Sequence, residues 1–313
     1  MNIVCTSFKF PVAEKELVPN IRRFSNVEQA NDIYLRCSFI CLLSAIKNGG
    51  ADRAIFVTDT PLDEQWASVF RNENIEVIIA ESTDRFVVDS QAEWNITQYK
   101  YEAMCSVCSK LDPTDNLLFL DSDTITVESL ADIYTEIADG SLMLYDTRHS
   151  YSHPARKRIR ENCMLLFGEG NPVHWGGEFI AGNVKKVMEF LSECCDIAAR
   201  MKDTQGLQNV ADEHVTSIAI TRLTGIKIRN ASAYIYRFWT GDPYIVSTNY
   251  YFDRVVIWHL PAEKASGFKE VYQYYKKHAV LPNVDFIAKV SRMPTIHAPL
   301  SLRIRRRLKK LKK

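Results

Sequence analysis

The stretch from Leu117 to Asp123 constrains the fold of this chain more than any other part of the sequence. Leu117 to Leu120 form an apolar run that ends abruptly in Asp121, Ser122 and Asp123. Such a run predicts a buried strand of a parallel sheet. Because side chains of a strand alternate between its two faces, Asp121 and Asp123 are expected to point the same way.

Two carboxylates on one face at the end of a strand repel each other unless a cation lies between them. In open α/β sheets, ligands bind beyond the carboxyl ends of the strands. Asp121 and Asp123 therefore predict a site for a divalent metal that carries a phosphorylated ligand. The alternative is a turn that has Asp at two turn positions.

Strand-like and helix-like segments alternate along most of the chain. The alternation predicts right-handed parallel crossovers, and hence an α/β fold in which helices flank a mostly parallel sheet. Residues 1–298 are expected to form one domain, because no repeat, linker or shift in composition precedes residue 300. The strands are expected at residues 1–7, 54–58, 77–80, 117–123, 142–145, 174–183, 226–236 and 255–259, and the helices at residues 31–48, 62–71, 94–111, 127–138, 184–201 and 212–225.

The composition is that of an ordinary soluble globular protein, with 46% hydrophobic and 25% charged residues. No apolar run approaches the roughly 20 residues of a membrane span, and the N-terminus lacks the features of a signal peptide. We therefore expect a cytoplasmic protein. The eight cysteines are expected to be buried thiols, including Cys105 and Cys108, which have no second pair at zinc-binding spacing.

Polar residues at the ends of predicted elements are candidates for ligand binding. Thr6 and Ser7 end the first strand, where small hydroxyl residues allow a nucleotide to approach the backbone. Lys100 lies in the helix before the acidic strand end and is expected to reach a phosphate, unless it is a solvated charge. Asp212 and Glu213 open a helix, where carboxylates are often only favourable partners of the helix dipole.

Glycines flank the strand predicted at residues 174–183. Gly176 and Gly177 precede its apolar part and Gly182 follows it. Glycine allows a backbone to approach a ligand closely, and the alternative is a bulged strand. The last predicted strand ends in His259, which is a metal ligand only if other ligands converge on the same sheet edge.

Basic residues gather in two places. Residues 147–160 are expected to form a basic loop, either a mobile lid over an anionic ligand or a solvated face, with Arg148, Arg156, Lys157, Arg158 and Arg160. Residues 303–313 contain eight Lys or Arg and no acid, which leaves 31 basic against 38 acidic side chains in the rest of the chain. The positive charge is therefore concentrated in a C-terminal tail.

In the tail, residues 299–313, the apolar side chains fall on one helical face: Leu300, Ile304, Leu308 and Leu311. This pattern predicts a basic amphipathic helix that lies on an anionic membrane, where each Lys or Arg adds about 1 kcal/mol. The alternative is a disordered solubilising tail. Nucleic-acid binding is not expected, because no basic patch with aromatic residues occurs elsewhere.

In their order, these landmarks resemble the GT-A-fold glycosyltransferases, and most closely the retaining enzymes of families 8 and 6, which include lipopolysaccharide galactosyltransferases, glycogenins and blood-group transferases. The matching features are Lys-x-x-Ala from Lys100 to Ala103, Asp-x-Asp at a strand end, the Gly-Gly-x-Phe-x-x-Gly strand, an acidic pair that opens a helix, and a strand that ends in His. The resemblance covers roughly residues 1–265 and implies a Rossmann-like sheet that binds a nucleotide sugar. The chain lacks the Asp-x-x-Tyr that follows the first strand in family 8 and the Lys-Pro-Trp after the final His.

The resemblance implies a role for each matching residue. Asp121, Asp123 and His259 would bind a metal. The residues that would bind the nucleotide sugar are Thr6, Ser7, Lys100, Asp121, Ser122, Gly176, Gly177 and Lys264. The acids that would face the reacting sugar, as stabiliser, nucleophile or wall of the sugar site, are Asp212, Glu213 and Glu178.

Two carboxylates and one imidazole suit Mn²⁺, with Mg²⁺ as the alternative. A metal there would neutralise the diphosphate of a departing UDP, and a negative group near the anomeric carbon would stabilise an oxocarbenium ion. The predicted function is therefore transfer of a hexose, with retention, from a UDP-sugar to a glycan or lipid-linked saccharide in cell-envelope polysaccharide or glycolipid synthesis. We expect the protein to act on the cytoplasmic face of a membrane.

Three other functions remain open. An inverting GT-A glycosyltransferase would use the same metal site. A sugar-1-phosphate nucleotidylyltransferase would normally carry a Gly-rich basic loop after the first strand, whereas residues 8–20 contain no glycine. A non-catalytic module would bind the nucleotide sugar without turnover.

Overall fold

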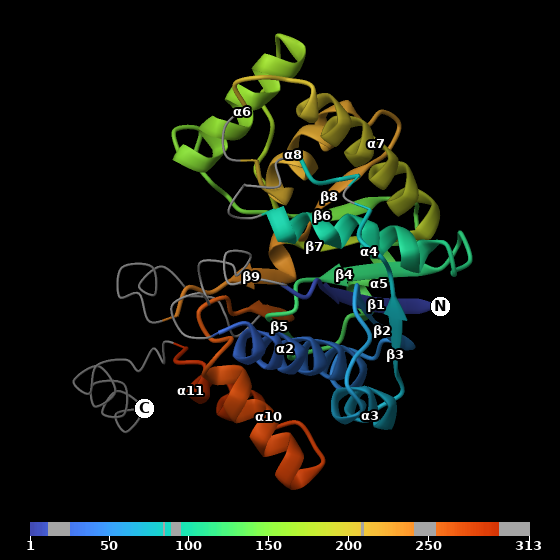
Figure 1. Cartoon of the computed structure of the whole chain (residues 1–313), viewed down its shortest axis with the longest axis vertical. Helices are drawn as coiled ribbons and strands as arrows, with labels where there is room; N and C mark the ends of the chain where they lie inside the picture. Colours follow the sequence, from blue (N-terminus) through green and yellow to red (C-terminus); the bar gives the residue numbers. More distant parts are fainter. Residues whose placement is uncertain (12–25, 84, 89–94, 208–209, 241–254, 294–313) are drawn as a thin grey trace, which may run out of the picture.

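The computed structural model of the chain describes residues 1–11, 26–83, 85–88, 95–207, 210–240 and 255–293. A seven-stranded sheet in the order β3-β2-β1-β4-β7-β6-β8 runs through its centre (Figure 1). The strands of this sheet are β1 (Asn2–Phe8), β2 (Arg53–Thr58), β3 (Ile75–Ile79), β4 (Asn116–Leu120), β6 (Leu142–Asp146), β7 (Trp175–Asn183) and β8 (Ile228–Asn230).

The strand directions place several carboxyl ends at one edge of this sheet. β1 is parallel to β2 and β4, and β2 is parallel to β3. β7 is antiparallel to β4 and β6, and β6 is parallel to β8. The sheet is therefore mostly parallel, as predicted. Because Leu120 pairs with Phe179, the first residues of β7 lie beside the segment that follows β4.

The sheet separates two hydrophobic cores, and its side chains divide between them with period two. Val4 and Leu118 belong to one core, whereas Ile3, Leu117 and Phe119 belong to the other. Burying an aliphatic or aromatic side chain stabilises a fold by roughly 1.5–3 kcal/mol, so both faces of the sheet contribute. Two buried faces explain why β1 and β4 are continuous apolar runs in the sequence.

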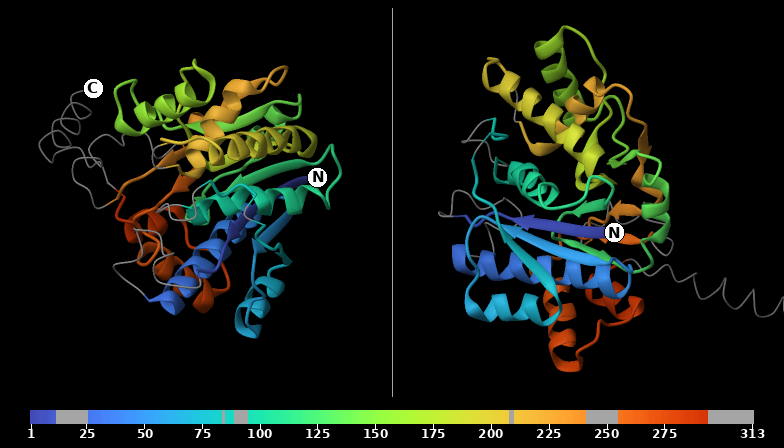
Figure 2. Two further views of the ribbon diagram at one scale, coloured as in Figure 1. Left: turned by 45° about the horizontal axis from the view of Figure 1, so that its top comes forward. Right: turned by 90° about the vertical axis from the view of Figure 1, so that its right-hand side faces the viewer.

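Helices cover both faces of the sheet (Figure 2). The helices of the first core are α2 (Val27–Lys47), α3 (Glu64–Asn72), α5 (Ala131–Ile137), α10 (Gly267–His278) and α11 (Val284–Val290). Those of the second core are α4 (Tyr99–Cys108), α6 (Pro154–Phe167), α7 (Val184–Lys202) and α8 (Asp212–Arg222). Polar residues fix their starts: Asn26 and Gln29 form a capping box at α2, and Asn183 caps α7 by accepting a hydrogen bond from Lys186 N–H at 2.9 Å.

A second, three-stranded sheet joins distant parts of the chain. Its order is β5-β10-β9, with β5 (Thr124–Thr126), β10 (Ile257–His259) and β9 (Ile235–Arg237). β10 is antiparallel to β5 and parallel to β9. The register sets His259 opposite Thr124 on one side and Arg237 on the other, so residues from three regions meet at one place.

The prediction that Asp121 and Asp123 lie on one face of a strand was wrong. β4 ends at Leu120, so Asp121 and Asp123 lie in a turn between β4 and β5 and not on one face of a strand. The hydroxyl of Thr124 donates a hydrogen bond to the Asp121 carbonyl at 2.9 Å and holds this turn. Turn geometry, and not strand alternation, therefore orients the two carboxylates.

The prediction of a loop at residues 147–160 was wrong for its second half, because α6 begins at Pro154. Pro suits the first helical turn, and the His153 ring accepts a hydrogen bond from Ala155 N–H at 3.2 Å as a cap. Ile159 and Cys163, four residues apart, are buried on one face of α6, which ends at Gly168 with a φ of 72°.

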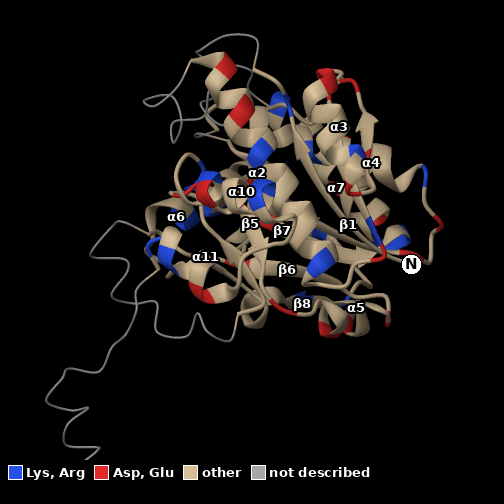
Figure 3. Cartoon of the chain, turned by 90° about the horizontal axis from the view of Figure 1, so that it is seen from below, with Lys and Arg blue, Asp and Glu red and all other residues tan. Residues whose placement is uncertain are grey.

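Other boundaries also differ from prediction. The helix expected at residues 94–111 is divided into a 3₁₀ turn, η2 (Asn95–Gln98), and α4, and another such turn, η3 (Ala231–Ala233), separates β8 from β9. α10 and α11 were not predicted. The predicted membrane-binding tail, residues 299–313, lies outside the described residues. Acidic and basic residues are interspersed along the described chain (Figure 3).

Candidate active site

A cavity of about 350 Å³ opens at the edge where β1 and β4 end, which is where ligands bind in open α/β sheets. Ser7 lines it from β1, and residues 121–123 line it from the turn after β4. Further lining residues come from six other elements and the segments beside them: Lys100, Arg158, His174, Gly177, Asp212, Glu213, Arg237, His259 and Lys264.

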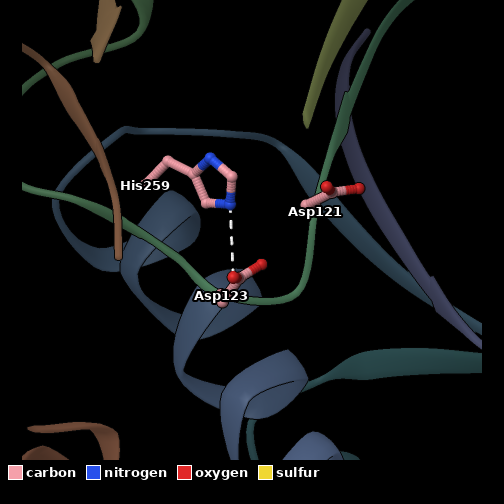
Figure 4. Close-up of side chains that lie close together, drawn as sticks. All are labelled: Asp121, Asp123 and His259. Atoms are coloured by element: carbon pink, nitrogen blue, oxygen red, sulfur yellow. Dashed lines mark ion pairs between the residues drawn. The ribbon is translucent and has the colours of Figure 1, made fainter. Parts of the chain in front are cut away.

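Three side chains at the wall of the cavity are arranged like a metal site. Asp121, Asp123 and His259 each offer one ligand atom, and these atoms lie within 4.8 Å of one another (Figure 4). His259 Nε2 lies 3.2 Å from Asp123 Oδ2. Among the described residues, no other group of His, Cys, Asp or Glu is arranged in this way.

The environment of His259 fits a metal ligand. Its Nδ1 lies 3.1 Å from Oε1 of Glu178, while its Nε2 faces Asp123. Metal-binding histidines commonly bond a carboxylate through the other ring nitrogen in this manner. Burial lowers the pKa of His259, but Asp123 and Glu178 outweigh burial and raise it to about 9. The site thus favours positive charge, and its donor set suits Mn²⁺ or Mg²⁺.

Lys264 adds a further cation beside Asp123. Lys264 comes from the segment between β10 and α10, is buried, and forms an ion pair with Asp123 Oδ2. Burial acts to raise the pKa of Asp123, but Lys264 and His259 together bring it well below its usual range. Asp123 is therefore ionised, which a metal ligand requires.

Lys100 forms ion pairs with two carboxylates of the cavity. Its Nζ lies 2.9 Å from Asp121 Oδ1 and 2.7 Å from Asp212 Oδ2, and it donates to the Gly177 carbonyl at 2.9 Å. Burial lowers the pKa of Lys100, but these carboxylates outweigh burial and raise it. Thr97 Oγ1 donates to Asp212 Oδ1 at 2.8 Å, so Asp212 is held from both sides.

The absence of a side chain at Gly177 is what permits this contact. A Cβ built on Gly177 would overlap Asp212 Oδ2 and lie 2.6 Å from Lys100 Nζ. Similarly, a Cβ at Gly176 would overlap Glu178 Oε2. Both glycines thus leave room for charged side chains of the site. These contacts explain why glycine occupies the two positions more specifically than close approach of a ligand does.

Arg237 connects two further acids and was not predicted from the sequence. Its Nε and Nη2 lie 2.7 and 2.6 Å from the oxygens of Glu178, and Nη2 lies 2.7 Å from Glu213 Oε1. Burial acts to raise the pKa of Glu178, but Arg237 and His259 lower it to about 2. Glu178 is fully buried in an apolar strand, and this was the signal for a missing cation, since such a charge needs a partner.

His174 lines the cavity and contacts a pair of histidines that lie outside the cavity lining. His174 Nε2 lies 2.7 Å from Glu213 Oε2, and His174 Nδ1 lies 2.8 Å from His149 Nδ1. The His149 ring stacks on that of His153 with 3.5 Å between centroids. Burial and the neighbouring histidines lower the pKa of His149 to about 4. Sequence analysis did not single out these histidines, because they carry no motif.

Neither protein-family models nor curated protein sequences match the chain. Among solved structures, the galactosyltransferase LgtC in complex with donor and acceptor sugar analogues has a TM-score of 0.51 and 13% sequence identity, over 96% of this chain and 99% of that one. An active-site mutant of LgtC gives 0.51 and 14%, over 82% and 86%. The bifunctional glycosyltransferase WbbM gives 0.51 and 12%, over 82% of this chain and 45% of that one.

The chain has the GT-A glycosyltransferase fold. This finding confirms the fold that the sequence predicted, because three structures of such enzymes share it. Within the GT-A fold, the cavity contains most of the predicted site residues. The exceptions are Thr6, which is buried in β1, and Gly176 and Glu178, which lie behind the wall of the cavity.

In the described part of this GT-A fold, we find no helix with the length and hydrophobicity needed to span a bilayer. The eight cysteines are all free. Six of them are buried and Cys105 and Cys195 are partly buried, in agreement with the prediction of thiols that pack in the interior.

Proposed function

We propose that the protein is a metal-dependent glycosyltransferase that moves a hexose from a UDP-sugar to a hydroxyl of a glycan or lipid-linked saccharide, with retention of configuration. The convergence of Asp121, Asp123 and His259 at the carboxyl end of β4 carries this proposal. These three residues would hold Mn²⁺ or Mg²⁺. When bound, the ion would supply positive charge to the diphosphate of the leaving nucleotide.

Cations of the chain itself support a diphosphate at the same place. Lys264 lies against Asp123, and Lys100 lies against Asp121, both inside the cavity. An ammonium has three hydrogen-bond donors, so a phosphate oxygen can accept from Lys264 beside Asp123, and from Lys100 in place of one of its three acceptors. Ser7 and Ser122 line the same part of the cavity, and we assign them to the nucleotide.

The acids at the start of α8 are placed to face the transferred sugar. Asp212 and Glu213 both line the cavity, with 8% and 26% of their side chains exposed. Burial acts to raise the pKa of Glu213, but Arg237 and His174 bring it well below its usual range. An ionised carboxylate beside the anomeric carbon stabilises positive charge that develops there, and we assign this role to Glu213.

We propose a role for Glu178 that differs from the one predicted. Glu178 is fully buried and does not line the cavity. Because it bonds both His259 and Arg237, we propose that it positions these two residues and does not contact the sugar.

The proposed reaction replaces one bond to the anomeric carbon with another. The bond between that carbon and the diphosphate oxygen breaks, and UDP leaves with its electron pair. A bond to the acceptor hydroxyl oxygen forms, and the hydroxyl proton passes to a base. Retention would be seen by NMR of the product, since the new linkage would have the anomeric configuration of the donor.

The experiment that tests the proposal is UDP release from a panel of UDP-hexoses, with EDTA and then with added Mn²⁺. We expect EDTA to abolish release and Mn²⁺ to restore it. Equal turnover in EDTA would contradict a metal-dependent transferase. Binding of UDP and Mn²⁺ without turnover on any donor would favour a non-catalytic module, and production of pyrophosphate from UTP and a sugar 1-phosphate would favour a nucleotidylyltransferase.

We further propose that residues 299–313 attach the enzyme to an anionic membrane that carries its acceptor. The pattern of Leu300, Ile304, Leu308 and Leu311 among basic residues supports this attachment. Deletion of residues 300–313 should reduce sedimentation with phosphatidylglycerol vesicles and leave UDP binding unchanged. Unchanged sedimentation would refute the attachment.

A further inference from the structure

Four basic side chains of the cavity have polar partners among the described residues: Lys9 donates a hydrogen bond to Ser82 Oγ at 2.8 Å, and the other three form ion pairs. Lys100 pairs with Asp121 and Asp212, Lys264 with Asp123, and Arg237 with Glu178 and Glu213. Arg158 also lines the cavity, yet within the described residues it forms no ion pair with a carboxylate. Its Nε is buried and finds no hydrogen-bond partner there. Arg158 is therefore a cation of the cavity whose charge no described carboxylate pairs with.

The fold aims Arg158 at the cavity. Arg158 and Ala155 lie three residues apart on α6, hence on one face, and both line the cavity. The neighbouring guanidinium groups of α6 contact other residues. Arg156 donates to the His149 carbonyl at 3.1 Å, and Arg160 lies over the Tyr151 ring, 4.3 Å from its centroid. Arg158 is therefore the residue of this basic helix that is directed at a bound molecule.

Arg158 lies near two histidines of the same region and opposes their protonation. Burial, His174 and Arg158 lower the pKa of both His153 and His214, whereas Glu213 and Asp212 act to raise that of His214. α6 belongs to the helical layer that includes α8, whereas α2 lies on the other face of the sheet (Figure 1). Within the described residues, α6 thus directs at the cavity a cation that forms no ion pair with a carboxylate.

We propose that Arg158 binds an anionic group, a carboxylate or a phosphate, on the acceptor saccharide. This inference rests on the proposed function, which already assigns the donor diphosphate to the metal site and Lys264. A guanidinium binds carboxylate and phosphate with two parallel hydrogen bonds, a geometry that a neutral hydroxyl does not match. The acceptor is therefore an acidic or phosphorylated glycan and not a neutral one.

The test is calorimetry on protein saturated with UDP and Mn²⁺, with three probes: glucuronic acid, glucose 6-phosphate and glucose. We expect the two anions to bind the wild type at least tenfold more tightly than glucose. Arg158→Gln should abolish this preference, and Arg158→Lys, which retains the charge, should keep part of it. The matched control is Lys157→Gln, which removes an exposed charge from the same helix and should behave as the wild type.

Equal or undetectable binding of all three probes to the wild type would overturn the inference, as would a preserved preference in a folded Arg158→Gln variant. A second measurement separates donor from acceptor. If Arg158→Gln raises the KM of UDP-glucuronic acid hydrolysis without acceptor but not that of UDP-glucose, the anion belongs to the donor sugar, and the acceptor assignment is wrong. Failure of the wild type to bind UDP with Mn²⁺ would instead refute the proposed function.

Discussion

The guanidinium of Arg237 and the carboxylate of Glu178 face each other with two hydrogen bonds of 2.7 and 2.6 Å. Glu178 is fully buried in β7, and 18% of the Arg237 side chain is exposed. β9 pairs with β10, and Glu178 Oε1 lies 3.1 Å from Nδ1 of His259 in β10. This ion pair is therefore connected to the candidate metal site. Its integrity should therefore affect both stability and metal binding.

Replacing Arg237 with Met should destabilise the protein strongly. Removing one partner of a buried ion pair leaves an uncompensated charge and typically costs about 3–5 kcal/mol. We expect a loss of this size in urea unfolding at pH 7. The control is Arg229→Met, which removes ion pairs with Asp139 and Glu136, both exposed by more than a third, and should cost only about 1 kcal/mol. Similar losses in the two variants would show that the Arg237 pair is not energetically special.

Much of the sheet could be predicted from the sequence because its strands are buried on both faces. A continuous apolar run such as Leu117–Leu120 is typical of a strand that is buried on both faces. α6 was missed in part because Arg156, Lys157 and Arg158 give its first turns a polar sequence, and its start depends on the cap by His153. The length of α6 is set by burial of Ile159 and Cys163 against α8 and β7, which is tertiary information.

The site was predictable where it carries a motif and not elsewhere. Asp121, Asp123 and His259 were found together because each ends a strand-like run, although a turn orients the first two. Arg237 lies in a segment without a distinctive pattern, and His174 directly precedes the Gly-Gly strand without being part of its motif. They reach the site only through the pairing of β9 with β10 and the position of β7, so their role is a consequence of topology.

Asp123→Asn should impair metal binding while keeping the shape of the side chain. Loss of an outer partner of a metal ligand typically costs 10–100-fold in metal affinity, so loss of a ligand charge should cost at least about tenfold. We expect this change in Mn²⁺ titrations followed by electron paramagnetic resonance. Asp132→Asn, at an exposed position of α5, is the control and should bind Mn²⁺ as the wild type does. Equal Mn²⁺ affinities of the two variants would show that Asp123 is not a metal ligand.

Gly177→Ala should reduce turnover of the UDP-sugar. The added Cβ displaces Asp212 Oδ2 and Lys100 Nζ, and a shift of about 1 Å at a reacting centre costs on the order of 100-fold in rate. The control is Gly50→Ala, whose Cβ meets no atom within 4 Å but whose φ of +74° is unfavourable, by roughly 1–2 kcal/mol. It should lower stability and leave kcat unchanged. A kcat for Gly177→Ala within twofold of the wild type would contradict the proposed role of the Lys100 contact.

His214 should make the stability of the protein depend on pH below neutrality. Its ring nitrogen Nδ1 accepts a hydrogen bond from Ala211 N–H at 3.0 Å, so the folded state requires the neutral ring. Burial lowers the pKa of His214 from 6.5 to about 4. Because the folded pKa is depressed, the stabilisation is present above pH 6.5 and is lost as the pH falls toward 4, by up to roughly 3 kcal/mol.

His214→Asn should remove this part of the pH dependence, because Asn does not titrate. We expect the fall in unfolding free energy between pH 6.5 and 4.5, measured with urea, to be smaller in the variant than in the wild type by about 2–3 kcal/mol. His278→Asn, at an exposed position at the end of α10, should follow the wild-type profile. The same slope in His214→Asn as in the wild type would mean that other groups, such as His149, account for the acid sensitivity.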